Sequence, residues 1–406
     1  MTKSGLIAFL VVLAMAANLH ADGGSNLAKR QAIMEAIISG DRGLAFRSMD
    51  QALPYRVVAK GGAIAELPRA ARKLEVSYQF NGDTHSLDDL LARTRTLGFL
   101  VISGGSIVDE RYFDGANDKS KFTSWSAAKS VTSTLVGLAV ADGKIASVND
   151  PVTTYLPELK GTAYEDVPIK DILEMSSGVA FTEEENNRTS DIWKMFFGTL
   201  VTQSQSFSEY VKTLRRRSEA PGAKWVYRSV DTEVLGMLAN RVMNQPLSEI
   251  LAKRIWQPAG MEQDATWITD GSGAEAAFCC LNATLRDYGR FGLLMLHRGK
   301  MGNRQIVPEK WISDATNPQG EQVTYGHLWP FLSDDSTGYG YQWWLPNGGE
   351  KHPYSAIGLY YQFIYVNPEL DLVIAKASAG PERFSIPGQN EQFAAFDAIG
   401  RFLQAH

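Results

Sequence analysis

The sequence Thr-Ser-Trp-Ser-Ala-Ala-Lys-Ser-Val-Thr, at residues 123–132, carries a serine and a lysine three positions apart at the predicted start of a helix. This helix is expected to run to about Ala141 and to stop at Asp142-Gly143, because glycine suits the left-handed residue that closes a helix. Positions i and i+3 share one helix face, so we expect the amine of Lys129 beside the hydroxyl of Ser126.

Two chemical requirements make this pair a candidate for catalysis. A serine hydroxyl is a poor nucleophile until a neighbouring base takes its proton. The amine of Lys129 can take that proton only when it is neutral, which burial favours, and the residues that follow it are largely apolar. The start of a helix also offers free backbone N–H groups, including that of Ser126, to a developing oxyanion.

The same tetrapeptide has an ordinary structural interpretation. A Ser-x-x-Lys pattern is expected about once by chance in a chain of this length. A serine at a helix start is most often an N-cap, and a lysine is most often solvated. Catalysis therefore has to be supported by other motifs.

Composition and charge narrow the class of protein. The chain has 406 residues, 44% of them hydrophobic and 21% charged, and its formal net charge is −5, which predicts a globular protein that does not bind nucleic acid. Its six histidines show no ligand spacing, so neither a metal nor a cofactor is predicted. The adjacent Cys279 and Cys280 can bridge only through a strained ring, so we expect two small buried residues and no disulfide.

The N-terminus has the pattern of a secretory signal peptide. Lys3 supplies the charged start, residues 6–17 are apolar, and small residues follow. Cleavage after Ala21 is favoured, with Ala16 and Ala17 as alternatives. The apolar run is too short for a stable membrane span, and no later segment is long enough. The sequence therefore predicts an exported protein, periplasmic or secreted.

The distribution of helical and strand patterns predicts an α+β fold. Residues 22–85 form an N-terminal extension to which no chemistry is assigned. A hairpin is expected at 98–113, and residues 168–300 are mainly helical. Three β-type runs follow at 339–345, 359–366 and 370–377, and a last helix covers 390–404. These elements predict an antiparallel sheet built from 86–145 and 300–406, flanked by helices, with a helical region inserted at 146–299.

Two further motifs extend the candidate site. Tyr227-Arg228-Ser229 precedes a predicted helix, and a tyrosine hydroxyl there could relay the serine proton. Ala356-Ile357-Gly358-Leu359 lies on a predicted strand, where glycine would let a substrate approach and the N–H of Leu359 could donate to an oxyanion opposite that of Ser126. Taken alone, the tyrosine motif is more often just an aromatic residue at the start of a helix. Taken alone, the glycine motif is more often an edge strand that the glycine weakens.

Taken together, and in this order, the three motifs resemble those of the serine β-lactamase-like family. The resemblance covers about residues 86–406 and extends to further segments, listed here: Asp150-Pro151, residues 155–159 (Tyr-Leu-Pro-Glu-Leu), residues 175–178 (Met-Ser-Ser-Gly), residues 256–261 (Trp-Gln-Pro-Ala-Gly-Met) and residues 284–287 (Thr-Leu-Arg-Asp). The resemblance implies that Ser126 is acylated, that Lys129 and Tyr227 share the acid–base work, and that water then hydrolyses the acyl-enzyme. It also implies an oxyanion hole made by the N–H groups of Ser126 and Leu359.

Two departures from the family pattern bear on the substrate. The second motif of class C β-lactamases, which resemble this chain, is Tyr-x-Asn, whereas this chain has Ser229 at the third position. Their third motif is Lys-Thr-Gly, whereas this chain has Ala356 in place of the lysine. The missing cation disfavours β-lactams and D-Ala-ended peptides, whose carboxylate it would bind. The expected partner is instead a small ester or amide, as in the esterase and 6-aminohexanoate-dimer-hydrolase branch.

The expected substrate-binding residues are listed here: Ser229, Ile357, Gly358, Trp343 and Tyr360, with Trp344 nearby. Two alternatives stay open, namely a β-lactamase or D-Ala carboxypeptidase, and a non-catalytic binding protein of the same fold. The oligomeric state is not predicted.

Overall fold

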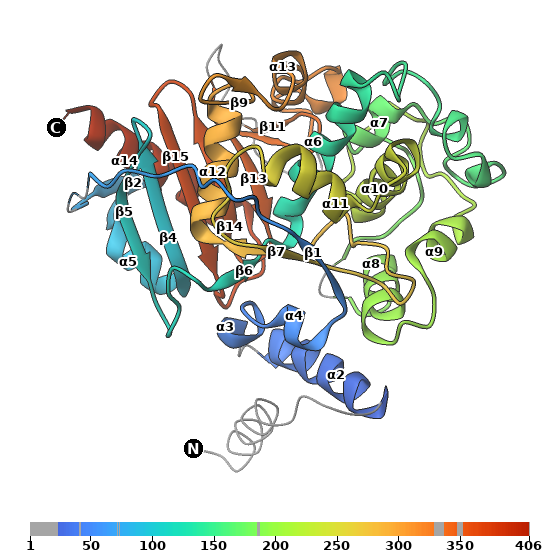
Figure 1. Cartoon of the computed structure of the whole chain (residues 1–406), viewed down its shortest axis with the longest axis horizontal. Coiled ribbons are helices and arrows are strands. Elements are labelled where there is room, and N and C mark those ends of the chain that lie inside the picture. Colours follow the sequence, from blue (N-terminus) through green and yellow to red (C-terminus); the bar gives the residue numbers. More distant parts are fainter. Residues whose placement is uncertain are drawn as a thin grey trace.

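A seven-stranded antiparallel sheet forms the centre of the computed structural model, which describes residues 23–39, 42–70, 72, 74–184, 187–328, 337–346 and 352–405 (Figure 1). The predicted signal peptide at 1–21 lies outside these residues. The strand order is β11-β12-β13-β14-β15-β4-β5. Its strands are β4 (Thr96–Ser103), β5 (Ser106–Tyr112), β11 (Thr337–Tyr339), β12 (Trp344–Pro346), β13 (Tyr354–Gly358), β14 (Gln362–Asn367) and β15 (Leu372–Ser378). The first two come from one end of the chain and the other five from the other, as predicted.

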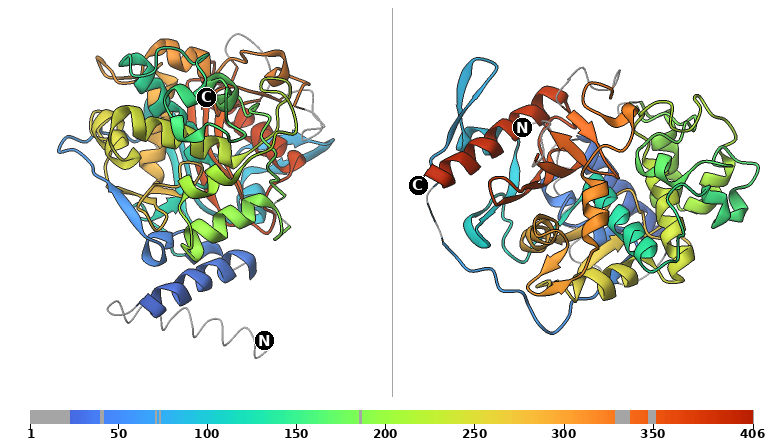
Figure 2. Two further views of the ribbon diagram at one scale, coloured as in Figure 1. Left: turned by 90° about the vertical axis from the view of Figure 1, so that its right-hand side faces the viewer. Right: turned by 90° about the horizontal axis from the view of Figure 1, so that it is seen from above.

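The two faces of this sheet are covered by different helices because side chains alternate along each strand. On β14, Phe363 and Tyr365 contact Phe393 and Phe396 of α14 (Ile386–Ala405). The side chains between them, such as Ile364, pack against α12 (Leu285–Leu296) in the main core. Figure 2 shows the molecule from two further sides, with α14 in red.

Helix α6 (Ala128–Ala141) follows the candidate nucleophile and runs through the interior between the large sheet and the helical region. Residues 128–139 of this helix are all buried. The chain turns at Asp142, and Gly143 has a φ of 67°, so the predicted helix end is confirmed. Because α6 is buried on every side, the residues at its start are held by packing as well as by hydrogen bonds.

The helical region lies on one side of α6 (Figure 1). Its helices are α7 (Ile169–Leu173), α8 (Asp191–Phe196), α9 (Phe207–Thr213), α10 (Ser229–Met243) and α11 (Leu247–Leu251), with π-helical turns at Phe197–Val201 and Ala252–Trp256. Short elements elsewhere are β2 (Ser77–Phe80), β3 (Asp83–Ser86), α5 (Leu87–Arg93), β9 (Lys300–Met301), β10 (Arg304–Gln305) and α13 (Glu309–Ala315).

A second, smaller sheet was not predicted from the sequence. Its strands, in the order β1-β7-β8-β6, are β1 (Tyr55–Val58), β7 (Ala265–Ile268), β8 (Leu281–Thr284) and β6 (Lys121–Thr123). β7 and β8 are four residues long and buried on both faces, so they lack the alternation that identifies a half-buried strand. This sheet matters to the site because β6 leads directly into the 3₁₀ turn Trp125–Ala127.

The N-terminal extension forms α2 (Gly23–Ser39), α3 (Arg42–Ala45) and α4 (Met49–Ala52) before it enters β1. In Figure 1 these blue helices lie below the rest of the molecule, and the left view of Figure 2 agrees. Within the described part of the chain, no helix is long and apolar enough to cross a membrane.

Candidate active site

Ser126 lies in the 3₁₀ turn that precedes α6, and the residue before it is in an unusual backbone conformation. Trp125 has a φ of 44°, a region that non-glycine residues enter at a cost of about 1–3 kcal/mol. Trp125 is held there by aromatic neighbours, with ring centroids of Phe46, Tyr360 and Phe196 at 5.4, 6.0 and 6.3 Å. The turn thus presents Ser126 from a position that the surrounding packing determines.

Lys129 is hydrogen-bonded to Ser126. Its Nζ donates to Oγ of Ser126 at 2.9 Å and to the carbonyl oxygen of Phe278 at 3.1 Å. The side chain is 2% exposed, so the amine is shielded from bulk water. The i, i+3 spacing predicted this contact, and the burial fits the requirement for a base that has to be neutral when it accepts a proton.

Tyr227 completes the group around the lysine. The Nζ of Lys129 lies 4.8 Å from the centre of the Tyr227 ring. That ring stacks on Trp344 of β12, with centroids 5.8 Å apart and planes at 26°. The N–H of the next residue, Arg228, donates to the sulfur of Met175 at 3.3 Å. The amine of Lys129 thus lies beside Ser126, the carbonyl of Phe278 and the ring of Tyr227, which come from three separate segments.

Gly358, the last residue of β13, approaches the backbone of the Ser126 turn more closely than a side chain would allow. A Cβ atom at this position would overlap the carbonyl oxygen of Ser124 and would lie 2.9 Å from Cβ of Trp125 and 3.1 Å from the backbone N of Ser126. Leu359 follows at once, and both Leu359 and Ser126 line the same two cavities. Tyr360 and Tyr361 continue with φ of 61° and 67°, a second strained turn beside the same serine.

Glu183 is a site residue that the sequence did not identify. Its carboxylate accepts hydrogen bonds from both the backbone N–H and the hydroxyl of Ser229 at the start of α10. Burial raises the pKa of this carboxyl above its usual value, while Lys129 in its protonated form and the Ser229 bonds act in the opposite direction. The only signal in the sequence was an acidic run at 183–185, a pattern that is usually just solvated.

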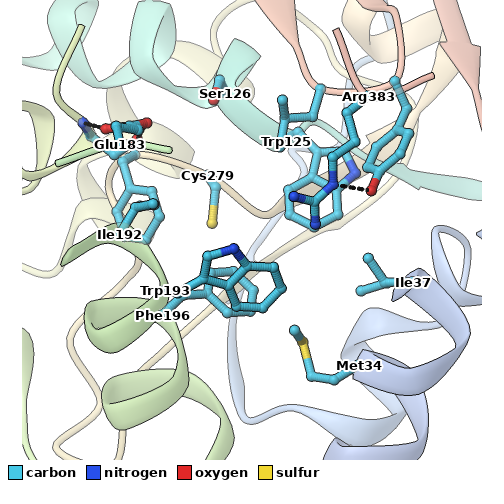
Figure 3. Close-up of a pocket in the computed structure, with 14 residues that line it drawn as sticks. Met34, Ile37, Trp125, Ser126, Glu183, Ile192, Trp193, Phe196, Cys279 and Arg383 are labelled. Atoms are coloured by element: carbon cyan, nitrogen blue, oxygen red, sulfur yellow. Dashed lines mark hydrogen bonds between the residues drawn. The ribbon is translucent and has the colours of Figure 1, made fainter. Parts of the chain in front are cut away.

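The candidate nucleophile lies where two cavities meet, and Ser126, Glu183 and Leu359 line both. The first, here called the aromatic lobe, is lined by Met34, Ile37, Trp125, Ile192, Trp193, Phe196, Ser229, Phe278, Cys279, Tyr360 and Arg383 as well (Figure 3). The second, the tyrosine lobe, is lined by Tyr227, Trp344, Ile357, Gly358 and Phe384 as well. Linings that are mainly apolar and aromatic, with a few polar groups, are typical of small-molecule sites.

One of the predicted pocket residues lies elsewhere. Trp343 is fully buried in the main core, where its ring packs against Phe291 and Tyr354, and it lines neither lobe. Its neighbour Trp344 faces the tyrosine lobe instead, because successive side chains here point to opposite sides. The prediction for Trp343 is therefore wrong.

The two cysteines are buried, as predicted, but the expectation that they form no disulfide is wrong. Cys279 and Cys280 form a disulfide between adjacent residues, and Cys280 has a φ of 67° in the turn that makes this possible. Cys279 lines the aromatic lobe, and the residue before it, Phe278, supplies the carbonyl that binds Lys129. Within the described ranges, no group of three or more His, Cys, Asp or Glu side chains has the arrangement of a metal site.

A buried lysine that is hydrogen-bonded to a serine and lies beside a tyrosine ring, next to two cavities, is an arrangement suited to a serine hydrolase. Residues 85–394 match the family model described as Beta-lactamase, and the chain therefore belongs to the β-lactamase family. It is accordingly an enzyme of the hydrolase class.

Three proteins to which this chain is similar are described here. The 6-aminohexanoate-dimer hydrolase of Paenarthrobacter ureafaciens is 27% identical over 305 residues, which cover 73% of this chain and 76% of that protein. The solved structure of a putative 6-aminohexanoate-dimer hydrolase from Bacillus anthracis has a TM-score of 0.81 and 24% identity, covering 91% of this chain and 96% of that one. The structure titled EstCE1, a hydrolase with promiscuous acyltransferase activity, has a TM-score of 0.60 and 12% identity, covering 77% and 96%.

Proposed function

We propose that this protein hydrolyses carboxylic esters or small amides through an acyl-enzyme on Ser126. The observation that carries the proposal is the 2.9 Å hydrogen bond between the buried Nζ of Lys129 and Oγ of Ser126. A nucleophile within hydrogen-bond reach of a shielded base is the arrangement that covalent catalysis needs.

The reaction proceeds in two halves. In the first, Oγ of Ser126 attacks the carbonyl carbon while its proton passes to the neutral amine of Lys129 or to a Tyr227 phenolate. The negative charge that develops on the carbonyl oxygen is bound by the N–H groups of Ser126 and Leu359. The bond to the leaving group then breaks, and the departing alcohol or amine takes a proton from the same acid–base pair. In the second half, a water molecule repeats these steps on the acyl-enzyme and releases the carboxylic acid.

The character of the tyrosine lobe supports an uncharged group at the end of the substrate that this lobe would hold. The described residues of the tyrosine lobe include one charged side chain, the carboxyl group of Glu183, and Ala356 offers no cation where Lys-Thr-Gly proteins have one. A substrate carboxylate bound there would face a group of like charge. The similarity to two 6-aminohexanoate-dimer hydrolases, and to a hydrolase with promiscuous acyltransferase activity, supports transfer of an acyl group from such a substrate to water.

The test is a panel of p-nitrophenyl esters, p-nitroanilides and the β-lactam nitrocefin. Wild type should cleave short esters or anilides faster than nitrocefin, and Ser126→Ala and Lys129→Ala should each lose at least about 10³-fold in kcat/KM. Ser77→Ala, which changes an exposed serine on β2 that lines neither lobe, is the matched control and should be unchanged. Preference for nitrocefin would favour a β-lactamase instead, and absence of any Ser126-dependent turnover would favour a binding protein.

We also infer export from the N-terminal pattern at residues 1–21. Mass spectrometry of the mature N-terminus should find Asp22 if cleavage follows Ala21, and an uncleaved cytoplasmic chain would contradict the inference.

A further inference from the structure

The aromatic lobe has one wall that comes from outside the family match. The match begins at residue 85, whereas Met34 and Ile37 of α2 line the lobe that contains Ser126. Figure 3 shows both side chains directed from the helix toward the cavity, across from Trp193 and Phe196. Met34 is 6% exposed and Ile37 is 1% exposed.

The extension is bound firmly to the parts of the fold that hold the nucleophile. The guanidinium of buried Arg42 donates to the carbonyl oxygens of Ile37 at 2.8 Å and of Gly380 at 3.0 Å, and it lies 4.6 Å from the centre of the Tyr360 ring. Arg42 therefore joins the last turns of α2 to the end of β15 and to the strained turn after Leu359. This connection makes α2 a fixed wall.

Phe46 makes a second connection, to the turns on either side of the candidate site in the sequence. Its ring lies 5.4 Å from the Trp125 ring and 5.1 Å from the Tyr360 ring, between the two residues with positive φ. Its carbonyl oxygen accepts a hydrogen bond at 2.9 Å from the N–H of Thr123, the last residue of β6. The segment that carries the lobe wall is thus packed against both turns of the candidate oxyanion hole.

We propose that the N-terminal segment, residues 23–53, determines substrate specificity by limiting the apolar group that the aromatic lobe accepts. The proposal rests on the proposed function, since it assigns this lobe to the apolar chain of the ester or amide. Met34 and Ile37 close the lobe with flexible and branched apolar surface, while Gln31 and Glu35 on the same helix are exposed. The part of the protein that matches the family model therefore carries out the hydrolysis, and the N-terminal extension selects the length of the substrate's apolar group.

The experiment changes the wall in two opposite directions. Ile37→Ala and Met34→Ala enlarge the lobe, and Ile37→Phe reduces it. Removing or adding a few carbon atoms in such a pocket typically changes discrimination by about 10-fold or more. Across p-nitrophenyl esters of increasing chain length, the enlarged variants should therefore gain kcat/KM for long chains relative to acetate by about 10-fold, and Ile37→Phe should lose it. Glu35→Ala, on the exposed face of α2, is the matched control and should keep the wild-type profile.

Opposite shifts in the two kinds of variant cannot result from partial unfolding, which would lower the rates for all chain lengths together. An unchanged chain-length profile in both Ile37→Ala and Ile37→Phe would overturn the proposal.

A second measurement separates this proposal from the chemistry. In a Ser126→Ala background, binding of straight-chain alcohols is followed by tryptophan fluorescence, because Trp125 and Trp193 line the lobe. Long alcohols should bind more tightly to the protein with Ile37→Ala and less tightly to the protein with Ile37→Phe. If these dissociation constants shift but wild type hydrolyses no ester or amide, the proposed hydrolase function is refuted, whereas the role of α2 in limiting the apolar group is supported. If the dissociation constants do not shift, that role of α2 is refuted, whatever the enzyme hydrolyses.

Discussion

Gly358→Ala tests whether the close approach of β13 to Ser126 is needed for the reaction. The added Cβ would lie 2.9 Å from Cβ of Trp125, whereas two carbon atoms pack at about 3.5–4.0 Å. Those two backbones must therefore separate by about 0.6–1.1 Å, and the overlap with the Ser124 carbonyl oxygen requires movement in the same direction. The N–H of Leu359 would then move away from that of Ser126.

The expected effect follows from how sharply an oxyanion hole depends on distance. Loss of one oxyanion donor typically costs about 10²–10³-fold, and a misplacement of about 1 Å can cost about 10²-fold. Gly358→Ala should therefore lower kcat for p-nitrophenyl acetate by about 10²-fold, with a smaller change in KM. Gly62→Ala is the matched control, because a Cβ at position 62 meets no atom within 4 Å.

Thermal unfolding of both variants shows whether the loss is specific to the site. A folded Gly358→Ala protein with wild-type kcat would refute the argument that this glycine places the second oxyanion donor. A large fall in Tm with activity unchanged below the transition would refute it as well.

Further predictions concern three other positions. Phe46→Ala should lower the free energy of unfolding by about 3–5 kcal/mol and also lower kcat, since the ring supports both strained turns. If the protein is destabilised but kcat below Tm is unchanged, Phe46 contributes to packing alone. Glu183→Gln should lower kcat/KM by about 10-fold and move the acid limb of the pH–rate profile, because Ser229 donates to both carboxylate oxygens and the amide keeps only one of them as an acceptor; an unchanged profile would contradict this. Burial raises the pKa of Asp231 from 3.8 to about 6, so the folded state binds this proton more tightly than the unfolded state does. The free energy of unfolding should therefore fall by about 3 kcal/mol as the pH rises from about 4 to above 6. Urea unfolding between pH 4 and 7 should show that fall in wild type and a reduced one in Asp231→Asn; identical slopes would contradict the assignment.

Local geometry explains what the sequence could predict. Lys129 lies beside Ser126 because i and i+3 share a helix face, and that relation needs no knowledge of the rest of the fold. The hairpin β4–β5 was predicted from Gly104 and Gly105, which both have positive φ. The end of α6 followed from Gly143 for the same reason.

The features that were missed depend on contacts between distant segments or on one step of register. Met34 and Ile37 reach the cleft because α2 packs against residues more than 80 positions away, and no periodicity in 22–85 indicates that. Neighbouring side chains point to opposite sides here, so Trp344 lines the cavity and Trp343 lies in the core, and a shift of one residue reverses that assignment. Glu183 acquires its role from Ser229, 46 positions later in the chain.

The disulfide between Cys279 and Cys280 needed a turn with a positive φ at a non-glycine residue. Such residues are uncommon, so the general rule that disfavours a bridge between neighbours gave the wrong answer here.

The most direct test of the central claim is intact-protein mass spectrometry during turnover of a short p-nitrophenyl ester. Wild type and Ser126→Ala are compared under the same conditions, with Lys129→Ala as a third sample. The account predicts an added mass equal to the acyl group on wild type, mapped by peptide analysis to Ser126, and no such mass on Ser126→Ala. An acyl group on another residue, or turnover that survives in Ser126→Ala, would contradict it.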